Sequence, residues 1–389
     1  MEVRAPEPHP LSPGPPSEGL GVGLRDGFRI VDADAHQIEP PEIWREYIEP
    51  AFRDRALRTE NGRLMVEGET LTSEKKYPLT SPEFMKATER QMERFKGSFE
   101  AGFDAATRIG DMDEQGVDIQ ILYPTFGAHV LGREFRDPEL LAASCAAYND
   151  WSAEYCDAAP ERLRWAAMLP LQAPQLAIEE ARRAHARGCV GFYVRPGPVA
   201  DRNLYHRDYE PLWAELEVLD RAVCLHDSGS PRIPSYGDRM DTHTSGHIIS
   251  HPFEAMVAMM SLIWFGVVER YPRLRFVHVE ADAGWLPFWI QRMQQHWDYS
   301  GNAEHPDLRR PPMEYFAESF FVATRGDEMT LPSVVELLGD ENLLFNTDYP
   351  HPDGTWPKGI QGLLDQPISV ESRRRIFADN AARAFGLKL

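Results

Sequence analysis

The sequence predicts an α/β fold and, within that class, a (β/α)₈ barrel. Short runs rich in β-branched and aromatic residues alternate with amphipathic helical patterns, and the alternation occurs eight times. Such alternation is typical of parallel βαβ units, and eight units can close into a barrel. A doubly wound open sheet is the alternative, but no GxGxxG follows the first run, which removes the commonest ligand signal of that fold.

The expected elements follow one another in a regular order. Strands are expected at 28–34, 118–124, 164–171, 190–196, 222–226, 275–280, 319–324 and 342–348. Helical patterns between them lie at 137–155, 176–188, 209–219 and 284–297. A last helix is expected to begin after Ser369, a candidate N-cap, and to end at Gly386.

Two segments break this rhythm. Residues 1–26 hold six prolines in the first 16 positions and predict a flexible leader, so the barrel is assigned to residues 27–389. Residues from about 50 to 104 are charged, and their apolar side chains are spaced as one helical face, which predicts an inserted helical segment after the first strand. This insertion either covers the barrel mouth or is a solvated helical hairpin without a role. The apolar residues concerned are Met85, Met92, Phe95 and Phe99.

The composition disfavours several classes of partner. A formal net charge of -20 disfavours binding to phosphate backbones and anionic membrane surfaces, so no nucleic-acid or membrane partner is expected. The longest apolar run, 255–268, has 14 residues, which is too short to span a bilayer and predicts a buried helix. The four cysteines show no CxxC spacing and lie in apolar patterns, as expected of reduced core thiols in a cytoplasmic protein.

Residues with metal-binding chemistry stand at the ends of several expected strands. The motif DADAH places Asp34 and His36 on one face of the first strand, because side chains alternate along a strand. Taken alone, this motif also fits a solvated strand end. His226 ends the fifth strand and Asp348 the eighth. Because the reacting groups of such barrels lie at the carboxyl ends of the strands, these four side chains are expected to converge.

The chemistry of this group predicts one divalent cation. Two imidazoles with two carboxylates suit Zn²⁺ first, and Mn²⁺ or Fe²⁺ are alternatives because oxygen supplies half of the ligands. Asp348 is expected to bind the ion, to accept a proton, or to do both in turn. On the sixth strand His278 and Glu280 have equal parity, so either could face the barrel axis.

Further candidates for substrate binding lie close to these strand ends. Arg195 and Arg325 both follow strands, and either could hold a substrate carboxylate in a bidentate fork. The alternative for Arg195 is a structural pair with a neighbouring acid. His247 and His251 lie four residues apart, a spacing that aligns imidazoles on one helical face. They suggest a second zinc site or a loop that touches substrate, and His351 is a further candidate in the same role.

Six segments, in order, resemble the amidohydrolase-related family, which includes aminocarboxymuconate-semialdehyde decarboxylase and γ-resorcylate decarboxylase. They are DADAHQIEP, GFYVRPGP, HPFEAMVAMMSLIWFGVVERYPRLRF, GWLPFWIQRM, NTDYPHPD and FADNAARAFGL. The similarity runs from about residue 28 to the C-terminus. It implies a distorted TIM barrel with one metal ion at its mouth. The resemblance assigns its ligands to Asp34, His36, His226 and Asp348, with DxH here where many relatives have HxH.

The chain departs from the family on two strands. Decarboxylase-like members place a catalytic histidine just ahead of a Gly-rich turn, where this chain has Glu280, with His278 two residues earlier. Either residue is therefore a candidate proton carrier beside Asp348, and Arg195 is a further catalytic candidate. Binuclear members of the superfamily use a carboxylated lysine on the fourth strand, which here ends in Arg195, so a mononuclear site is expected.

Two reactions on a small molecule fit this ligand set. Hydrolysis is expected, with metal-activated water attacking an amide, a lactone or a related C–N or C–O bond. Non-oxidative decarboxylation of an aromatic or unsaturated acid is the alternative, and it is ranked second because the sixth-strand histidine is replaced or displaced. A barrel that binds a ligand without turnover is disfavoured. A site with no catalytic role has no physical reason to keep charged groups packed together at a desolvation cost of several kcal/mol. Apolar residues around Trp264 and Trp285 suggest a homodimer, as is common among relatives.

Overall fold

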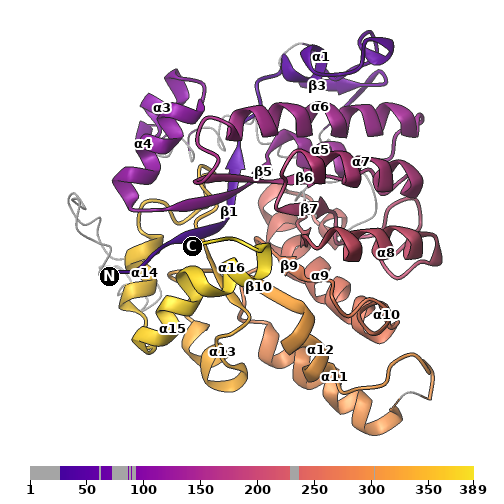
Figure 1. The fold of residues 1–389 in the computed structure, drawn as a ribbon, viewed down its shortest axis with the longest axis vertical. Helices are drawn as coiled ribbons and strands as arrows, with labels where there is room; N and C mark the ends of the chain where they lie inside the picture. The colour runs from indigo at the N-terminus through magenta and orange to yellow at the C-terminus, as the bar shows by residue number, and fades with distance from the viewer. Residues whose placement is uncertain are drawn as a thin grey trace, which may run out of the picture.

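Eight parallel strands form the centre of the protein (Figure 1). The computed structural model describes residues 27–60, 63–71, 86, 89, 93–227, 236–301 and 303–389, so the expected leader 1–26 lies outside the described residues. The strand order follows the chain from β1 to β11. The strands are β1 Val31–Gln37, β5 Ile119–Pro124, β6 Leu163–Met168, β7 Gly191–Val194, β8 Ala222–Leu225, β9 Phe276–His278, β10 Phe320–Arg325 and β11 Leu343–Asn346.

The sheet is nearly closed at its carboxyl end. The Asp348 N–H donates to the Asp34 carbonyl at 2.9 Å, and the His36 N–H donates to the Tyr349 carbonyl at 2.6 Å. Every residue of β1, β5, β7, β8, β9 and β11 is buried, as expected of parallel strands covered on both faces. The predicted (β/α)₈ barrel is confirmed, and the expected strands match the observed ones to within a few residues.

Helices surround this sheet, and the yellow C-terminal helices return to the indigo β1 (Figure 1). The Ser369 hydroxyl accepts a hydrogen bond from the Ser372 N–H, and Gly386 ends the last helix with φ 66°, as predicted. The helices are α1 Ile43–Glu46, α3 Lys96–Glu100, α4 Ala105–Gln115, α5 Phe126–Leu131, α6 Pro138–Cys156, α7 Pro174–Ala186, α8 Glu210–Leu219, α9 His243–Trp264, α10 Val267–Arg270, α11 Leu286–Ser300, α12 Pro312–Ser319, α13 Leu331–Leu338, α14 Gly359–Asp365, α15 Val370–Arg374 and α16 Asn380–Phe385, with a π turn at Arg375–Asp379.

The inserted segment contains a small sheet that the sequence prediction did not include. Strands β2 Arg58–Glu60, β3 Arg63–Val66 and β4 Glu69–Thr70 pair antiparallel. The turn between β3 and β4 has Glu67 and Gly68 at positive φ, and a Gly at such a place is a hairpin signal. Hydrogen-bonded hairpins therefore occupy part of the segment in which only a helical face was expected.

The predicted helical face of the insertion is described only in part. Met85 and Met92 lie outside the described residues. Phe95 is buried and its ring lies 5.3 Å from Tyr349 and 4.8 Å from Trp356, in the segment that follows β11. Phe99, in contrast, is 59% exposed. This part of the insertion therefore packs against the carboxyl end of the barrel through Phe95.

The segment after β8 also differs from its prediction. His247 and His251, for which a substrate-touching loop was one expectation, instead lie in the first turns of the 22-residue helix α9, whose N-cap Thr242 accepts from the Ser245 N–H. The expected buried helix at 255–268 is the continuation of α9 and α10. All four cysteines are buried and free. Within the described residues, no helix combines the length and apolar character that crossing a bilayer requires.

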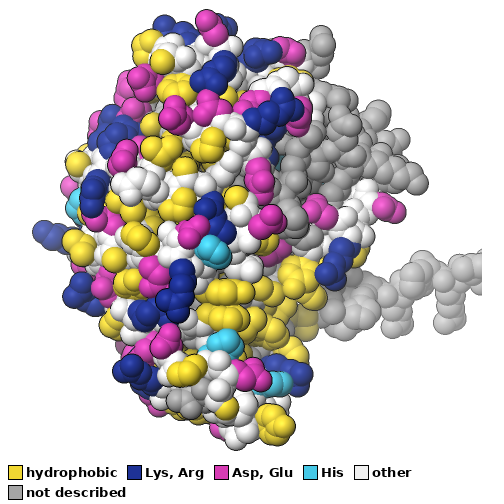
Figure 2. Space-filling model, turned by 90° about the vertical axis from the view of Figure 1, so that its right-hand side faces the viewer, with side chains coloured by type: hydrophobic (Ala, Val, Ile, Leu, Met, Phe, Trp, Pro, Cys, Tyr) yellow, Lys and Arg dark blue, Asp and Glu magenta, His cyan; other side chains and the backbone are white. Residues whose placement is uncertain are grey.

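Figure 2 shows the face that carries α7, α8 and α10, where acidic and basic side chains are interspersed. Some of them form ion pairs between helices, such as Arg182 with Glu215 at 2.6 Å and Arg270 with Glu210 at 2.6 Å. Exposed pairs of this kind each contribute little to stability. The expected homodimer and the expected lack of nucleic-acid and membrane partners stay predictions.

Candidate metal centre

Three strands bring the four predicted ligands together at the carboxyl end of the barrel. Asp34 and His36 come from β1, His226 follows β8, and Asp348 follows β11. His36 Nε2 lies 3.5 Å from Asp34 Oδ1 and 3.4 Å from Asp348 Oδ1. His226 Nε2 lies 3.1 Å from His36 Nε2 and 3.9 Å from Asp34 Oδ1. The four side chains thus converge, as the sequence predicted.

The second nitrogen of each histidine fixes the orientation of its ring. Nδ1 of His36 donates to the Pro124 carbonyl at 2.9 Å, and Nδ1 of His226 donates to the Asp227 carbonyl at 2.5 Å. These bonds direct both Nε2 atoms at the same point, where each offers a lone pair to a cation once it is deprotonated. Neither carboxylate oxygen of Asp34 has a hydrogen-bond partner among the described residues, although both are buried.

This concentration of unsatisfied lone pairs fits a cation. Two imidazole nitrogens 3.1 Å apart and a buried carboxylate repel one another unless positive charge lies between them. Burial raises the pKa of Asp34 to about 7 and lowers that of His36 well below its usual range. The donor set of imidazole and carboxylate therefore fits the divalent ion expected from the sequence.

Glu280 lies beside the four converging side chains and contacts three imidazoles. Its carboxylate oxygens lie 3.0 Å from His226 Nε2, 2.9 Å from His247 Nε2 and 3.2 Å from His251 Nε2. Burial alone would raise the pKa of Glu280, but the imidazoles led by His251 outweigh it and hold this pKa well below its usual range. Glu280 is therefore a carboxylate. His247 and His251 reach it from the first turns of α9, which aligns them on one face.

His278 does not reach the site, so its placement does not support the predicted catalytic role. Strand β9 ends at His278, and its ring packs on Phe320 and Trp285 with centroid distances of 5.9 and 6.1 Å. Neither ring nitrogen has a hydrogen-bond partner in the described part of the chain. Glu280 has φ 52°, and this left-handed residue breaks the alternation that gave the two side chains equal parity.

Arg195 is buried in an ion pair rather than directed into the mouth. Its Nε lies 3.3 Å from Asp227 Oδ1, and both side chains are almost fully buried. Arg195 does not line the main cavity. The predicted catalytic and substrate-binding roles of Arg195 are therefore replaced by its alternative, a structural pair with a neighbouring acid. Because the Asp227 carbonyl holds the ring of His226, this pair supports a candidate metal ligand.

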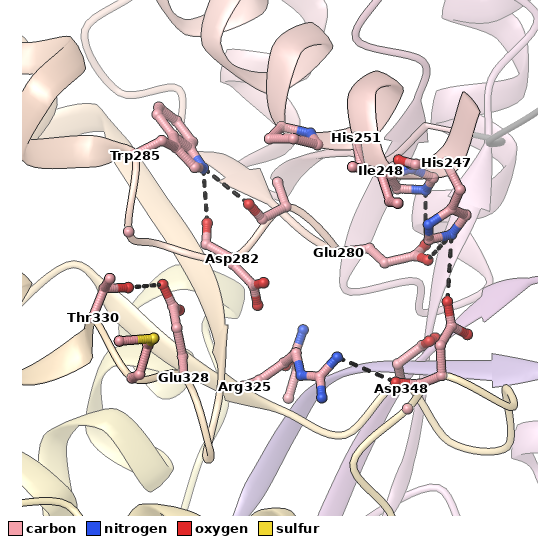
Figure 3. Close-up of a pocket in the computed structure, with 17 residues that line it drawn as sticks. His247, Ile248, His251, Glu280, Asp282, Trp285, Arg325, Glu328, Thr330 and Asp348 are labelled. Carbon is pink, nitrogen blue, oxygen red and sulfur yellow. Dashed lines mark hydrogen bonds and ion pairs between the residues drawn. The ribbon is translucent and has the colours of Figure 1, made fainter. Parts of the chain in front are cut away.

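A cavity of about 560 Å³ opens over Glu280 and Asp348 (Figure 3). His247, His251 and Arg325 also line it, which places three of the predicted substrate-binding residues around one space. The guanidinium of Arg325 bonds to Asp327 at 3.2 Å and to the Asp353 carbonyl at 3.2 Å.

His351 supports Asp348 and is not among the residues that line the cavity. Its Nδ1 lies 2.9 Å from Asp348 Oδ1, and its Nε2 lies 3.0 Å from the Thr125 hydroxyl. Burial raises the pKa of Asp348 to about 8. Burial works against a charge on His351, but the Asp348 carboxylate outweighs it and raises the pKa of His351 to about 10.

Sequence reasoning missed the residues that hold these groups in place. Asp32 is fully buried and accepts from the Thr347 N–H at 2.9 Å and from Gln120 Nε2 at 3.2 Å, which ties β1 to both neighbouring strands. The first aspartate of the DADAH motif was a signal for this role. Asp282 and Glu328 also line the cavity, but neither belongs to a sequence motif that signals a role there.

A model of the amidohydrolase family matches residues 31–387. The chain belongs to the amidohydrolase family. This result confirms the resemblance inferred from the sequence, and it covers the whole barrel with the inserted segment.

Curated members of the family similar to this chain are decarboxylases. The chain is 27% identical over 293 residues to 2-amino-3-carboxymuconate-6-semialdehyde decarboxylase from Dictyostelium discoideum, covering 73% of this chain and 77% of that protein. It is 30% identical over 298 residues to gamma-resorcylate decarboxylase from a Rhizobium species, covering 72% of this chain and 86% of that protein. A solved structure of dihydroxybenzoic acid decarboxylase from Polaromonas sp. JS666, with bound manganese and the inhibitor 2-nitroresorcinol, has a TM-score of 0.65 and 21% identity, covering 92% of this chain and 97% of that one.

These relatives contradict the prediction of hydrolysis. Each of them is named for the loss of a carboxyl group. The prediction relied on the missing histidine at the end of the sixth strand. In this amidohydrolase-family chain, His247 and His251 of α9 supply imidazoles to the same place and contact Glu280. Both histidines were expected to bind substrate, but their approach to the end of the sixth strand could not be predicted from strand ends alone.

Proposed function

We propose that this protein is a metal-dependent decarboxylase that removes CO₂ without oxidation from an aromatic or unsaturated carboxylic acid. The observation that carries the proposal is the convergence of Asp34, His36, His226 and Asp348 on one point at the edge of a cavity that also holds an arginine. The names of the curated relatives support the same reaction.

In this proposal Asp34, His36, His226 and Asp348 hold one divalent ion. Zn²⁺ and Mn²⁺ both suit two imidazoles with two carboxylates, and manganese is bound in the Polaromonas decarboxylase. When bound, the ion supplies positive charge that orients an anionic substrate and stabilises charge that develops beside it. The buried carbonyl partners of His36 and His226 keep their Nε2 atoms directed at this position.

Side chains around the cavity bind the substrate and transfer the proton in this proposal. Arg325 presents positive charge to an incoming acid. The bond between the carboxyl carbon and the ring or alkene carbon breaks, CO₂ leaves, and the carbon takes up a proton. Asp348 is the proposed donor of this proton because it lines the cavity and His351, whose Nδ1 lies 2.9 Å from its Oδ1, can resupply the proton. His351 orients Asp348 through the contact to Oδ1.

The test is a CO₂ assay on purified protein loaded with Mn²⁺ or Zn²⁺. Hydroxybenzoic acids and unsaturated dicarboxylic acids are supplied one at a time, and CO₂ is compared with the acid consumed. The proposal expects one CO₂ for each molecule of one of these acids. Asp348→Asn is expected to lower the rate by about 1,000-fold while the fold is kept, because an amide cannot donate the proton. Protein that holds one ion per chain but releases no CO₂ from the whole panel would contradict the proposal.

A further inference from the structure

The side of the cavity away from Asp348 contains a carboxylate that the proposed reaction does not use. Figure 3 shows Asp282 and Trp285 on this side, with the Asp282 carboxylate directed into the open space. Asp282 follows β9 and has φ 52°, a conformation that non-glycine residues seldom adopt. The cavity itself, about 560 Å³, is larger than one benzoic acid requires.

In the described part of the chain, no hydrogen bond or ion pair reaches the carboxylate of Asp282, although the charge of Arg325 is near enough to lower its pKa. Trp285 Nε1, which lines the same part of the cavity, bonds instead to the backbone carbonyls of Ala281 at 3.0 Å and Asp282 at 2.9 Å. Burial raises the pKa of Asp282 to about 6, which still leaves it ionised at neutral pH. Two carboxylate oxygens are thus offered to whatever enters the cavity.

Glu328, a second carboxylate that lines the cavity, differs from Asp282 because it does have hydrogen-bond partners. It accepts from the Ala283 N–H at 2.9 Å and from the hydroxyls of Thr324 and Thr330 at 2.6 Å each. Glu328 therefore holds the loop after β9, whereas Asp282 on that loop stays available. The two acids lie on the same wall and differ in whether the protein satisfies them.

We propose that Asp282 determines substrate specificity by accepting a hydrogen bond from an amino or hydroxyl group at the end of the substrate remote from the reacting carboxyl group. An ionised carboxylate only accepts, so its ligand must donate. Trp285 and Met329 line the same space and give an apolar surface for a flat ring beside this contact. The inference rests on the proposed function, which fixes the reacting carboxyl group near Asp348.

The test measures binding rather than turnover. The probes are 4- and 5-amino-2-nitrophenol and their 4- and 5-methyl counterparts, in which the nitro and phenolic oxygens stand in for the carboxylate and a neighbouring hydroxyl of the substrate. Affinity for Mn²⁺-loaded protein is measured by calorimetry. At least one amino probe is expected to bind about 10-fold tighter than its methyl partner, as a charged acceptor predicts.

Two variants remove the carboxylate without straining the backbone. Asn and Gly both tolerate the left-handed conformation, so Asp282→Asn and Asp282→Gly are expected to fold normally and to lower the preference to about 3-fold or less. Asp365→Asn is the matched control, because among the described residues Asp365 accepts only from Gln361, on an exposed helix surface, and the charge change is the same. This control should keep the full preference.

The outcomes separate this inference from the proposed function. Equal binding of amino and methyl probes by the unaltered protein, or a preference that survives in both Asp282 variants, would overturn the inference even if CO₂ is released from an acid. A preference that depends on Asp282 in a protein that releases no CO₂ would instead leave the recognition intact and reject the reaction.

Discussion

The end of β1 and the end of β9 bear similar motifs and behave differently. In β1 the backbone stays extended to the last residue; the register with β5 shifts between Asp32 and Ala35, and Asp34 and His36 still reach the same point. In β9 the strand ends at His278, and Glu280 follows with φ 52°. Of His278 and Glu280, only Glu280 faces the site. Alternation therefore predicts side-chain direction as far as the extended backbone continues, and no further.

The largest expected effect tests this difference with two histidines. His36→Ala should remove a ligand of the proposed ion and lower decarboxylation by about 10,000-fold or more, because the charge that orients the substrate is lost with it. His278→Leu, at the end of β9, should keep one ion per chain and a near-normal rate. Metal content by mass spectrometry and kcat from CO₂ release measure both. Equal metal loss in the two variants would show that the two strand ends contribute alike.

A smaller effect is expected from the carboxylate that replaces the sixth-strand histidine. Glu280→Gln keeps the shape of the side chain but loses the charge that holds His226, His247 and His251. Positioning residues of this kind typically change metal affinity or activity by 10- to 100-fold. The readouts are the dissociation constant for Mn²⁺ and kcat/KM, since a purely structural role would change neither.

Glu328→Gln is the comparison for Glu280. Glu328 lines the same cavity, but it accepts hydrogen bonds from the Ala283 N–H in the loop after β9 and from the hydroxyls of Thr324 and Thr330. Its substitution should lower the free energy of unfolding by about 1 to 3 kcal/mol through unsatisfied donors and leave Mn²⁺ affinity near normal. If Glu280→Gln behaved in this way, the contact between Glu280 and the three imidazoles would have no bearing on the site.

Much of the fold and the four converging side chains could be predicted because both follow local rules. Strand and helix alternation sets the barrel, and the carboxyl ends of its strands bring Asp34, His36, His226 and Asp348 together. Arg195 could not be assigned, because the choice between substrate and Asp227 depends on which acid lies 3.3 Å away in space. The reaction was wrongly predicted for a related reason. His247 and His251 approach from a helix whose start was taken for a loop.

The last expected effect concerns stability in acid, and it depends on His278. Burial lowers its pKa to about 3, against 6.5 for an exposed histidine, so the folded protein favours the neutral ring. The unfolded chain therefore binds more protons between these values. The stability that the neutral ring contributes is complete above pH 6.5 and decreases as the pH falls towards 3. Near pH 5 the slope is about 1.4 kcal/mol per pH unit for this one group.

His278→Leu is expected to remove this part of the acid sensitivity, because a leucine between Phe320 and Trp285 has no proton to bind. The measurement is the free energy of unfolding in urea at pH 7, 6 and 5 for both proteins, each without added metal so that ligand protonation is common to the two. The difference between variant and parent should grow in favour of the variant as the pH falls. A difference that stays constant over this range would mean that water or a polar partner reaches His278, and the contrast drawn between the two strand ends would then fail on the β9 side.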